Sequence, residues 1–357
     1  MTERRESVFS SLSNKGKETT TSPSHRILGL DFTKGVLVLF MVLYHWLNYF
    51  TDAGSEVYRY LRFVNPSFIF LTGFLISNVY PSKYQLADYQ LPRRLAIRAG
   101  KILALFVLIN MGIGFLLSQS YRGRVQFDVS SLESISAIFL SGNVYRESVG
   151  KAAAFHILVP ISYLLFISGG LLIIRRFWAY IFHAVFGGCL LTVLVLRIGG
   201  IEFMNLDLLT VGFLGAVLGA VRMDAINHSA KYPIVLGTIY ILYIALVTLY
   251  GTPYVVLLVG VCLSIMLIYA TGYSQEDPGF FKRRLILLGR YSLFGYINQI
   301  AILQLMFKLV GRQGLGLHVS SALLVCAIVL TILTVEAVEY GRPKSVFVDK
   351  CYRVVFT

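Results

Sequence analysis

Long apolar segments, separated by short polar ones, run along almost the whole chain. Ten of them are centred near residues 40, 70, 107, 164, 187, 212, 241, 262, 298 and 327. A membrane-spanning helix needs about 20 mostly apolar residues, and none of these segments alternates polar and apolar positions as a membrane strand would. The pattern therefore predicts an all-α polytopic membrane protein with about ten transmembrane helices in one bundle.

Polar regions flank this predicted bundle and interrupt it once. Residues 1–25 are rich in Ser, Thr and charge, which predicts a disordered cytoplasmic tail, and residues 341–357 are a predicted cytoplasmic C-terminal tail. Between them, residues 26–340 form one membrane domain. Its one long connection, residues 118–152, contains SLESISAIFLSG (Ser131–Gly142), which is too short to span and is predicted to lie at the interface.

The composition fits a membrane protein, because 56% of the residues are hydrophobic and only 14% are charged. The net charge of +14 raises the alternative of nucleic-acid binding. If the N-terminus is cytoplasmic, however, 21 of the 32 Lys and Arg residues fall in cytoplasmic segments and 9 in outer ones. This asymmetry follows the positive-inside rule. We therefore expect an integral protein of the plasma (inner) membrane with both termini cytoplasmic, a lipid bilayer as its surroundings, and no nucleic-acid partner.

The first apolar segment, LDFTKGVLVLFMVLYHWLNYF (Leu30–Phe50), carries polar residues on a single helical face. The spacing of three and four residues puts these positions in one stripe: Asp31, Lys34, Val38, Met41, His45 and Asn48. Ionisable groups facing lipid are costly, so this face is predicted to be buried in the bundle. Asp31 and Lys34 could serve as an i,i+3 packing pair while His45 hydrogen-bonds a neighbour. Alternatively, His45 could act as a general base.

Four motifs occur in order along the chain: RILGLDFTKGVLVLFMVLYH (Arg26–His45), FVNPSFIFLTGFLIS (Phe63–Ser77), LPRRLAIRAGKIL (Leu91–Leu103) and LLGRYSLFGYINQ (Leu287–Gln299). These motifs resemble those of the acyltransferase family 3 superfamily. This superfamily includes glucan succinyltransferases and is related to the lysosomal heparan-glucosaminide acetyltransferase. The chain departs from the family pattern at two positions, since Lys34 stands where Arg is usual and Gln299 stands where many members have His.

The resemblance implies a multi-span enzyme that moves an acyl group, such as acetyl or succinyl, from a cytoplasmic acyl-CoA to a carbohydrate or glycolipid acceptor. Acyl-CoA would be a co-substrate, and no bound cofactor or metal is implied. It implies catalytic roles for His45 and Asp31. The expected donor-binding residues are Lys34, Arg94, Arg98, Lys101 and Arg290. Three of them, Arg94, Arg98 and Lys101, form a cationic face suited to phosphates, although they would also serve as positive-inside anchors.

Other polar residues within the predicted spans extend the candidate cavity. The expected cavity or acceptor residues are Asn48, Arg62, Asn65, His156, Asn298 and Gln299. On a helical projection, Arg290, Tyr291 and Asn298 lie on one side of the ninth span and Gln299 on the other. Helix-to-helix hydrogen bonding explains Asn65 and Asn298 equally well. Asp207 is a less favoured acceptor contact, and Glu336 and Glu339 are expected to be solvated at the interface.

Two other classes of function stay open. Ten spans with a polar stripe also describe a transporter or flippase whose substrate passes along that stripe. A broken helix in matching positions of two halves would favour transport, and the sequence shows no internal repeat. If the polar faces do not converge, a membrane scaffold without catalytic activity is favoured.

Overall fold

The computed structural model describes residues 27–51, 55–83, 90–117, 131–143, 145–146, 150–151, 153–273, 278–311 and 316–356. The predicted tail, residues 1–25, and most of the long connection lie outside the described residues. The described chain is a helical bundle, and its strands β1 (Tyr145–Arg146) and β2 (Gly150–Lys151) form one short antiparallel pair. The prediction of an all-α polytopic membrane protein is confirmed.

The helices follow one another with short connections. They are α1 (Leu28–Phe50), α2 (Ser55–Arg59), α3 (Val64–Ser77), α4 (Val79–Lys83), α5 (Gln90–Leu117), α6 (Leu132–Ile135), the π-helix η1 (Ser136–Ser141), α7 (Leu158–Ile174), α8 (Ile181–Ile198), α9 (Met204–Leu218), α10 (Met223–Ala230), α11 (Pro233–Tyr250), α12 (Tyr254–Gly272), α13 (Phe280–Arg290), α14 (Ser292–Val310), α15 (Leu317–Lys344) and α16 (Val346–Phe356). Thus α6 and η1 occupy the segment Ser131–Gly142 that was predicted to be an interfacial helix.

The predicted number of ten spans is slightly too high. In the described part of the chain, 8 helices are long and apolar enough to cross a membrane, or up to 9 if a bent pair counts as one span. That pair is α9 and α10, which meet at 98°. The segment centred near residue 164 forms α7, which has only 17 residues and is therefore shorter than a typical span.

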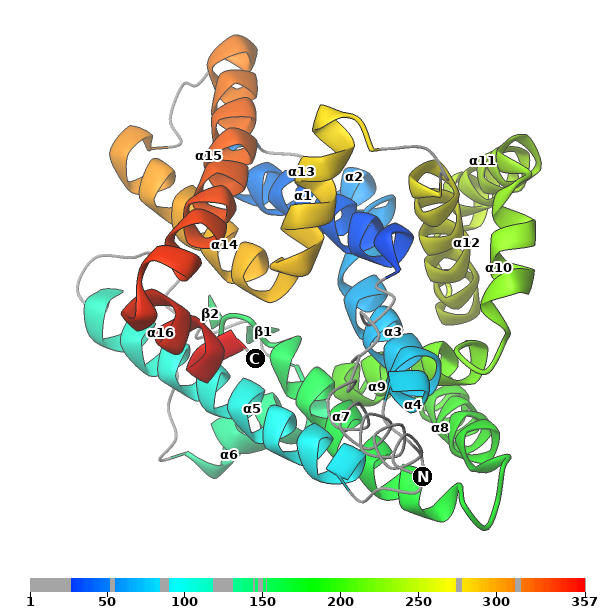
Figure 1. Ribbon diagram of the computed structural model, residues 1–357. Coiled ribbons are helices and arrows are strands. Elements are labelled where there is room, and N and C mark those ends of the chain that lie inside the picture. Colours follow the sequence, from blue (N-terminus) through cyan, green and yellow to red (C-terminus); the bar gives the residue numbers. More distant parts are fainter. Residues whose placement is uncertain are drawn as a thin grey trace, which may run out of the picture.

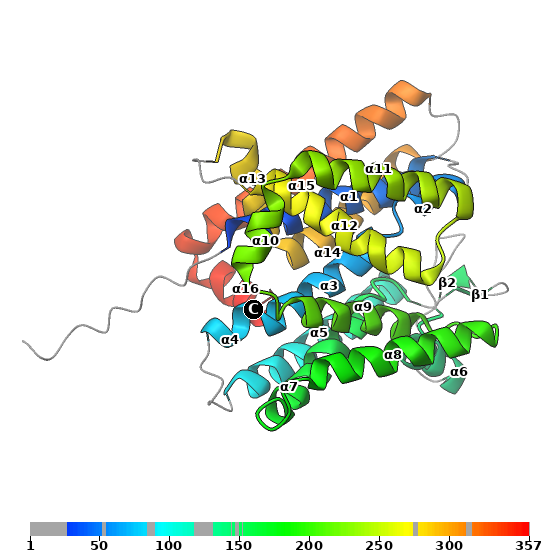
Figure 2. The ribbon, with the colours of Figure 1, turned by 90° about the vertical axis from the view of Figure 1, so that its right-hand side faces the viewer.

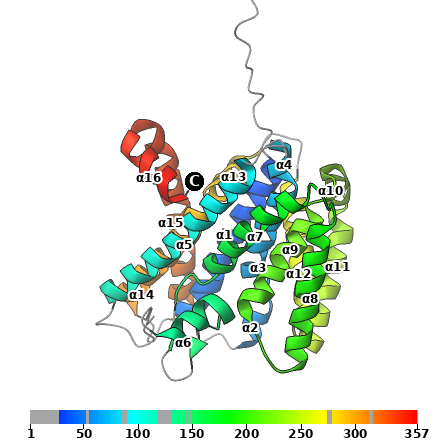
Figure 3. The ribbon, with the colours of Figure 1, turned by 90° about the horizontal axis from the view of Figure 1, so that it is seen from below.

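Helix α1 is the centre of one half of the bundle. It packs against α3, α12, α13, α14 and α15, while α5, α7, α8 and α9 form a second group joined to α1 through α3 (Figure 1). The spans run roughly side by side in Figure 2. In Figure 3 the short helices α4 and α10, together with α13 and α16, gather at one end of the bundle, and α2 and α6 lie at the other.

Glycines allow two helix pairs to approach at backbone distance. A Cβ atom at Gly289 of α13 would overlap the carbonyl oxygen of Asp31 on α1, and one at Gly35 would overlap the carbonyl oxygen of Leu285. On α3, a Cβ atom at Gly73 would overlap the carbonyl oxygen of Gly212 on α9. Small residues let membrane helices pack closely without a hydrophobic driving force between them. These two contacts therefore fix the position of α1 relative to α13 and of α3 relative to α9.

Replacing Gly289 with Ala should destabilise the protein, because the added methyl group must push two helix backbones apart. Overpacking of this kind costs about 1–3 kcal/mol. We expect a lower melting temperature for the purified Gly289→Ala protein. The matched control is Gly187→Ala on α8, where a Cβ would meet no atom within 4 Å. Equal melting temperatures for the two variants would contradict the close contact.

Candidate functional site

The polar stripe of α1 is intact, because α1 is one uninterrupted helix from Leu28 to Phe50. Asp31 is buried at 4% exposure, and its Oδ1 lies 2.7 Å from Nζ of Lys34. The i,i+3 ion pair expected from the spacing is therefore present at the start of the helix. Farther along, Asn48 is exposed and donates to the carbonyl oxygen of Tyr44 at 3.1 Å.

His45 lies nearer the opposite end of α1, about 21 Å along the helix axis from Asp31 at 1.5 Å per residue. Its ring is half-buried, with Nε2 shielded from solvent. The ring meets the edge of Tyr44 at a centroid distance of 5.3 Å, and Tyr44 meets Tyr58 of α2 at 5.6 Å. His45 is thus held among aromatic rings, apart from the Asp31–Lys34 pair.

The three cations of the third motif lie along α5, on the side that does not pack against α7. Arg94 and Arg98 are exposed and Lys101 is half-buried, while Leu91, Leu95, Ala99 and Ile102 are buried. Arg94 donates to Oε1 of Gln90 at 3.2 Å, and Arg98 donates to the hydroxyl of Tyr80 on α4 at 2.6 Å. Tyr80 was not predicted to be a site residue from the sequence, because it becomes a neighbour of Arg98 only through folding.

The ninth predicted span differs from expectation, because the helix breaks at Tyr291. Arg290 ends α13 and is exposed, whereas Asn298 and Gln299 belong to α14. The predicted common face of Arg290, Tyr291 and Asn298 is therefore wrong, since it assumed one continuous helix. Asn298 instead donates to Oγ1 of Thr334 on α15 at 2.6 Å. Gln299 has no exposed surface and lies on the inner side of α14.

The remaining predicted cavity residues belong to other elements than α1. Arg62 sits in the turn before α3, is exposed, and donates to Oγ1 of Thr252 at 2.7 Å. Asn65 is half-buried in the first turn of α3, and His156 is half-buried just before α7. Arg62 thus joins α3 to the connection between α11 and α12.

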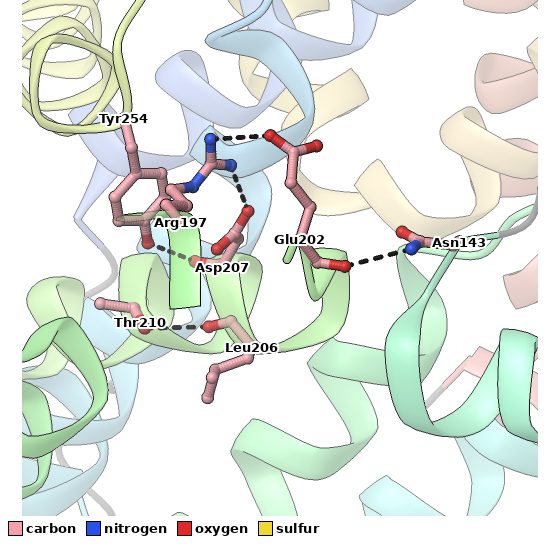
Figure 4. A network of polar contacts seen from close by, with 7 residues as sticks. All are labelled: Asn143, Arg197, Glu202, Leu206, Asp207, Thr210 and Tyr254. Carbon is pink, nitrogen blue, oxygen red and sulfur yellow. Dashed lines mark hydrogen bonds and ion pairs between the residues drawn. The ribbon is translucent and has the colours of Figure 1, made fainter. Parts of the chain in front are cut away.

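Asp207 belongs to a network of polar contacts that links the segment after η1 to α8 and α9 (Figure 4). Its Oδ2 lies 2.5 Å from Nη2 of Arg197 on α8, and Nη1 of Arg197 lies 3.0 Å from Oε1 of Glu202. The hydroxyl of Tyr254 donates to the carbonyl oxygen of Asp207 at 2.7 Å. Asn143, two residues after η1, donates to the carbonyl oxygen of Glu202 at 3.1 Å. This is a structural role that does not require an acceptor.

A second polar network, which the sequence did not predict, joins α16 to the break between α13 and α14. The hydroxyl of Tyr291 donates to Oε2 of Glu339 and accepts from Nη1 of Arg342 at 2.8 Å. Nη2 of Arg342 also lies 2.8 Å from Oδ1 of Asp349 on α16. Nearby, Arg284 contacts Glu336 at 2.6 Å. Glu336 and Glu339 thus have side-chain partners, while Glu339 is also exposed and Glu336 is partly exposed, as expected for carboxylates at the interface.

The charge of Asp349 is stabilised within this network. Hydrogen bonds from Arg342, followed by a hydrogen bond from Arg353, hold the pKa of Asp349 below its usual value. A lowered pKa means that the stabilising contact exists above the ordinary Asp pKa of about 3.9 and is lost as the pH falls through the folded-state value. The docking of α16 should therefore be insensitive to pH in the neutral range.

Hydrogen exchange can test this link between Asp349 and α16. After correction for intrinsic exchange, protection of α16 should be constant from about pH 8 to 5 and should fall only below about pH 4. Asp349→Asn should lose that protection at neutral pH. The control is Asp224→Asn, because Asp224 pairs with Arg222 at 3.2 Å with both side chains more than 80% exposed. Unchanged protection of α16 in Asp349→Asn would show that the network does not hold the helix.

Comparison of the chain with protein-family models, curated proteins and solved structures found no match. The resemblance to the acyltransferase family 3 superfamily therefore rests on the four motifs alone. Within those motifs, the structure brings Asp31 and Lys34 together, and it pairs Arg98 and Asn298 with partners outside the predicted set.

Proposed function

We propose that this protein is an integral-membrane acyltransferase that moves an acyl group from acyl-CoA to a hydroxyl or amine of a carbohydrate or glycolipid. The observation that carries the proposal is the intact α1 stripe, with a buried Asp31–Lys34 ion pair near one end and His45 near the other. Buried ionisable groups in a membrane helix mark functional positions more often than structural ones. Among the possible functions, we choose acyl transfer because of the four motifs.

In the proposed reaction, one end of α1 contributes to donor binding and the other end to proton transfer. Cations near the Asp31 end, namely Lys34 and the α5 residues, would bind the phosphates of acyl-CoA. The flexible arm of the donor would carry the thioester toward His45. There His45 would take the proton from the acceptor hydroxyl as its oxygen attacks the acyl carbonyl carbon, and the carbon–sulfur bond would break to release the thiol of CoA.

We propose that the protein lies in the plasma (inner) membrane. In the orientation we propose, both termini are in the cytoplasm. The end of the bundle formed by α10, α13 and α16 is rich in Lys and Arg, with Lys282, Arg283 and Arg284 on α13 alone. Basic residues favour the cytoplasmic side. This orientation brings the proposed donor cations to the compartment that contains acyl-CoA.

A transporter or flippase is the second candidate, and one structural feature favours it. Helices α9 and α10 form a pair that is bent by 98° and can count as one broken span. Discontinuous membrane helices commonly form substrate sites in transporters. Incubation of the purified protein with labelled acetyl-CoA or succinyl-CoA and a carbohydrate acceptor separates the two candidates, because thioester cleavage is expected only from the enzyme.

His45→Gln should lower turnover by at least about a hundredfold, because general-base catalysis typically contributes 10² to 10⁴-fold. Glutamine keeps the size and hydrogen bonding of the imidazole but cannot accept a proton near neutral pH. The control is His183→Gln on α8, an exposed histidine outside the predicted site. Near-normal turnover by a stably inserted His45→Gln protein would refute the role of His45 as the general base. His156 would then be the next candidate.

Arg98→Gln should raise the KM for acyl-CoA roughly tenfold, the effect expected from losing one charge-assisted hydrogen bond. Tyr80→Phe removes the hydroxyl that holds Arg98 and should raise the same KM by a smaller factor. Arg93→Gln is the matched control, since Arg93 is also exposed on α5 but lies outside the predicted cationic face. Equal KM values for Arg98→Gln and Arg93→Gln would show that Arg98 does not bind the donor and serves as a positive-inside anchor.

A further inference from the structure

Gln299 stands out among the buried polar residues of the bundle. Its side chain has no exposed surface, and neither Oε1 nor Nε2 has a hydrogen-bond partner among the described residues. Its neighbour Asn298 shows the usual situation, because its amide donates to Thr334. An amide that is buried without partners loses its bonds to water and gains nothing in exchange.

The neighbours of Gln299 along α14 show which way it faces. One turn earlier, Gly295 is turned toward Val38 of α1, and one turn later Leu303 packs in a cluster with Val42 and Trp46 of α1. Residues four apart lie on the same face of a helix. Gln299 therefore faces α1 in the stretch between Val38 and Trp46, which contains the inner part of the polar stripe.

Aromatic rings lie beside this position. Tyr296, three residues before Gln299, meets Phe68 of α3 at 6.1 Å and Phe155 at 5.7 Å. Phe155 has a φ of 55°, which is uncommon for a residue with a side chain. Its position is held from α5, since the amide of Asn110 donates to the carbonyl oxygen of Ala154 at 3.0 Å and accepts from its backbone N–H at 2.7 Å.

Strained, buried backbone of this kind persists only where its surroundings enforce it, and it is concentrated at binding sites. Here the enforced conformation brings the ring of Phe155 to Tyr296, one turn from the unpartnered amide. A mostly apolar, aromatic lining with a few converging polar groups is the usual composition of a small-molecule site. The amide and the strained segment are independent observations that point to the same part of the bundle.

We infer that Gln299 is a binding residue for a hydroxyl group of a neutral, hydroxyl-bearing ligand such as a sugar. A primary amide offers N–H donors on one side and a carbonyl acceptor on the other, and a hydroxyl can accept a hydrogen bond from the first and donate one to the second. A phosphate or carboxylate would leave the carbonyl oxygen of the amide facing negative charge, so the donor phosphates do not fit. Identifying the ligand as the acyl acceptor rests on the proposed function, whereas binding of a hydroxyl does not.

The site is closed in this structure, because Gln299 has no exposed surface. A ligand must therefore displace some of the side chains that cover Gln299 when it enters. The closed form should also be less stable than it would be with an apolar residue at this position. A substitution that stabilises the free protein while weakening binding is the result that distinguishes a ligand-binding amide from a packing residue.

The test compares Gln299→Met with Gln304→Met, a matched change on the same helix at a half-buried position. The probes are the methyl glycosides of glucose, galactose and N-acetylglucosamine, added to purified full-length protein in a detergent without sugar groups. We expect at least one probe to raise the melting temperature of the wild-type protein in a saturable way. Gln299→Met should raise the melting temperature of the free protein and weaken probe binding by roughly tenfold or more, the loss expected for one to two buried hydrogen bonds.

Equal probe binding by the wild-type and Gln299→Met proteins, or no saturable shift of the wild-type protein with any probe, would overturn the inference. If Gln299→Met does not insert, Gln299→Asn retracts the amide by one carbon and should also weaken binding, while unchanged binding by it would again count against the role. Thioester cleavage of acyl-CoA in the presence of the same glycosides is measured in parallel. Its absence from a wild-type protein that binds a glycoside would defeat the proposed acyl transfer but would leave the probe-binding result intact.

Discussion

The contact between the backbones of α1 and α13 is the constraint on which the rest of this half of the bundle depends. Gly35 and Gly289 remove the side chains that would separate the two helices. As a result, Asp31 is covered by α13, and the break at Tyr291 follows directly after this contact. The same close approach positions the start of α14, whose residues Gly295 and Leu303 face α1.

Several polar groups of the bundle have their partner on another helix. Arg197 meets Asp207, Asn298 meets Thr334, and Trp46 donates to the carbonyl oxygen of Ser320 on α15 at 2.9 Å. Without water to replace a missing partner, every such bond limits how helices can slide or rotate. The polar residues thus select one arrangement among helices whose apolar surfaces are much alike.

The sequence predicted features that repeat along one helix but not those that join helices distant in the chain. The spacing from Asp31 to Asn48 predicted the face of α1 because helical periodicity is local. The partners Tyr80, Thr252 and Thr334 could not be predicted, since nothing near Arg98, Arg62 or Asn298 indicates which helix will lie beside them. The break at Tyr291 was missed because Leu287–Gln299 was taken as part of one continuous helix, although Gly289, Arg290 and Ser292 interrupt its apolar pattern there.

The motif residues separate into two physical groups. Gly35, Gly73 and Gly289 stand in three of the four motifs, and close helix packing accounts for all three without any chemistry. They would be required in a transporter or scaffold with the same bundle, so they bear on the fold more than on the activity. Gln299 is different, because an apolar residue would fill its buried position at lower cost. The case for a specific function therefore depends on the polar side chains that packing does not require.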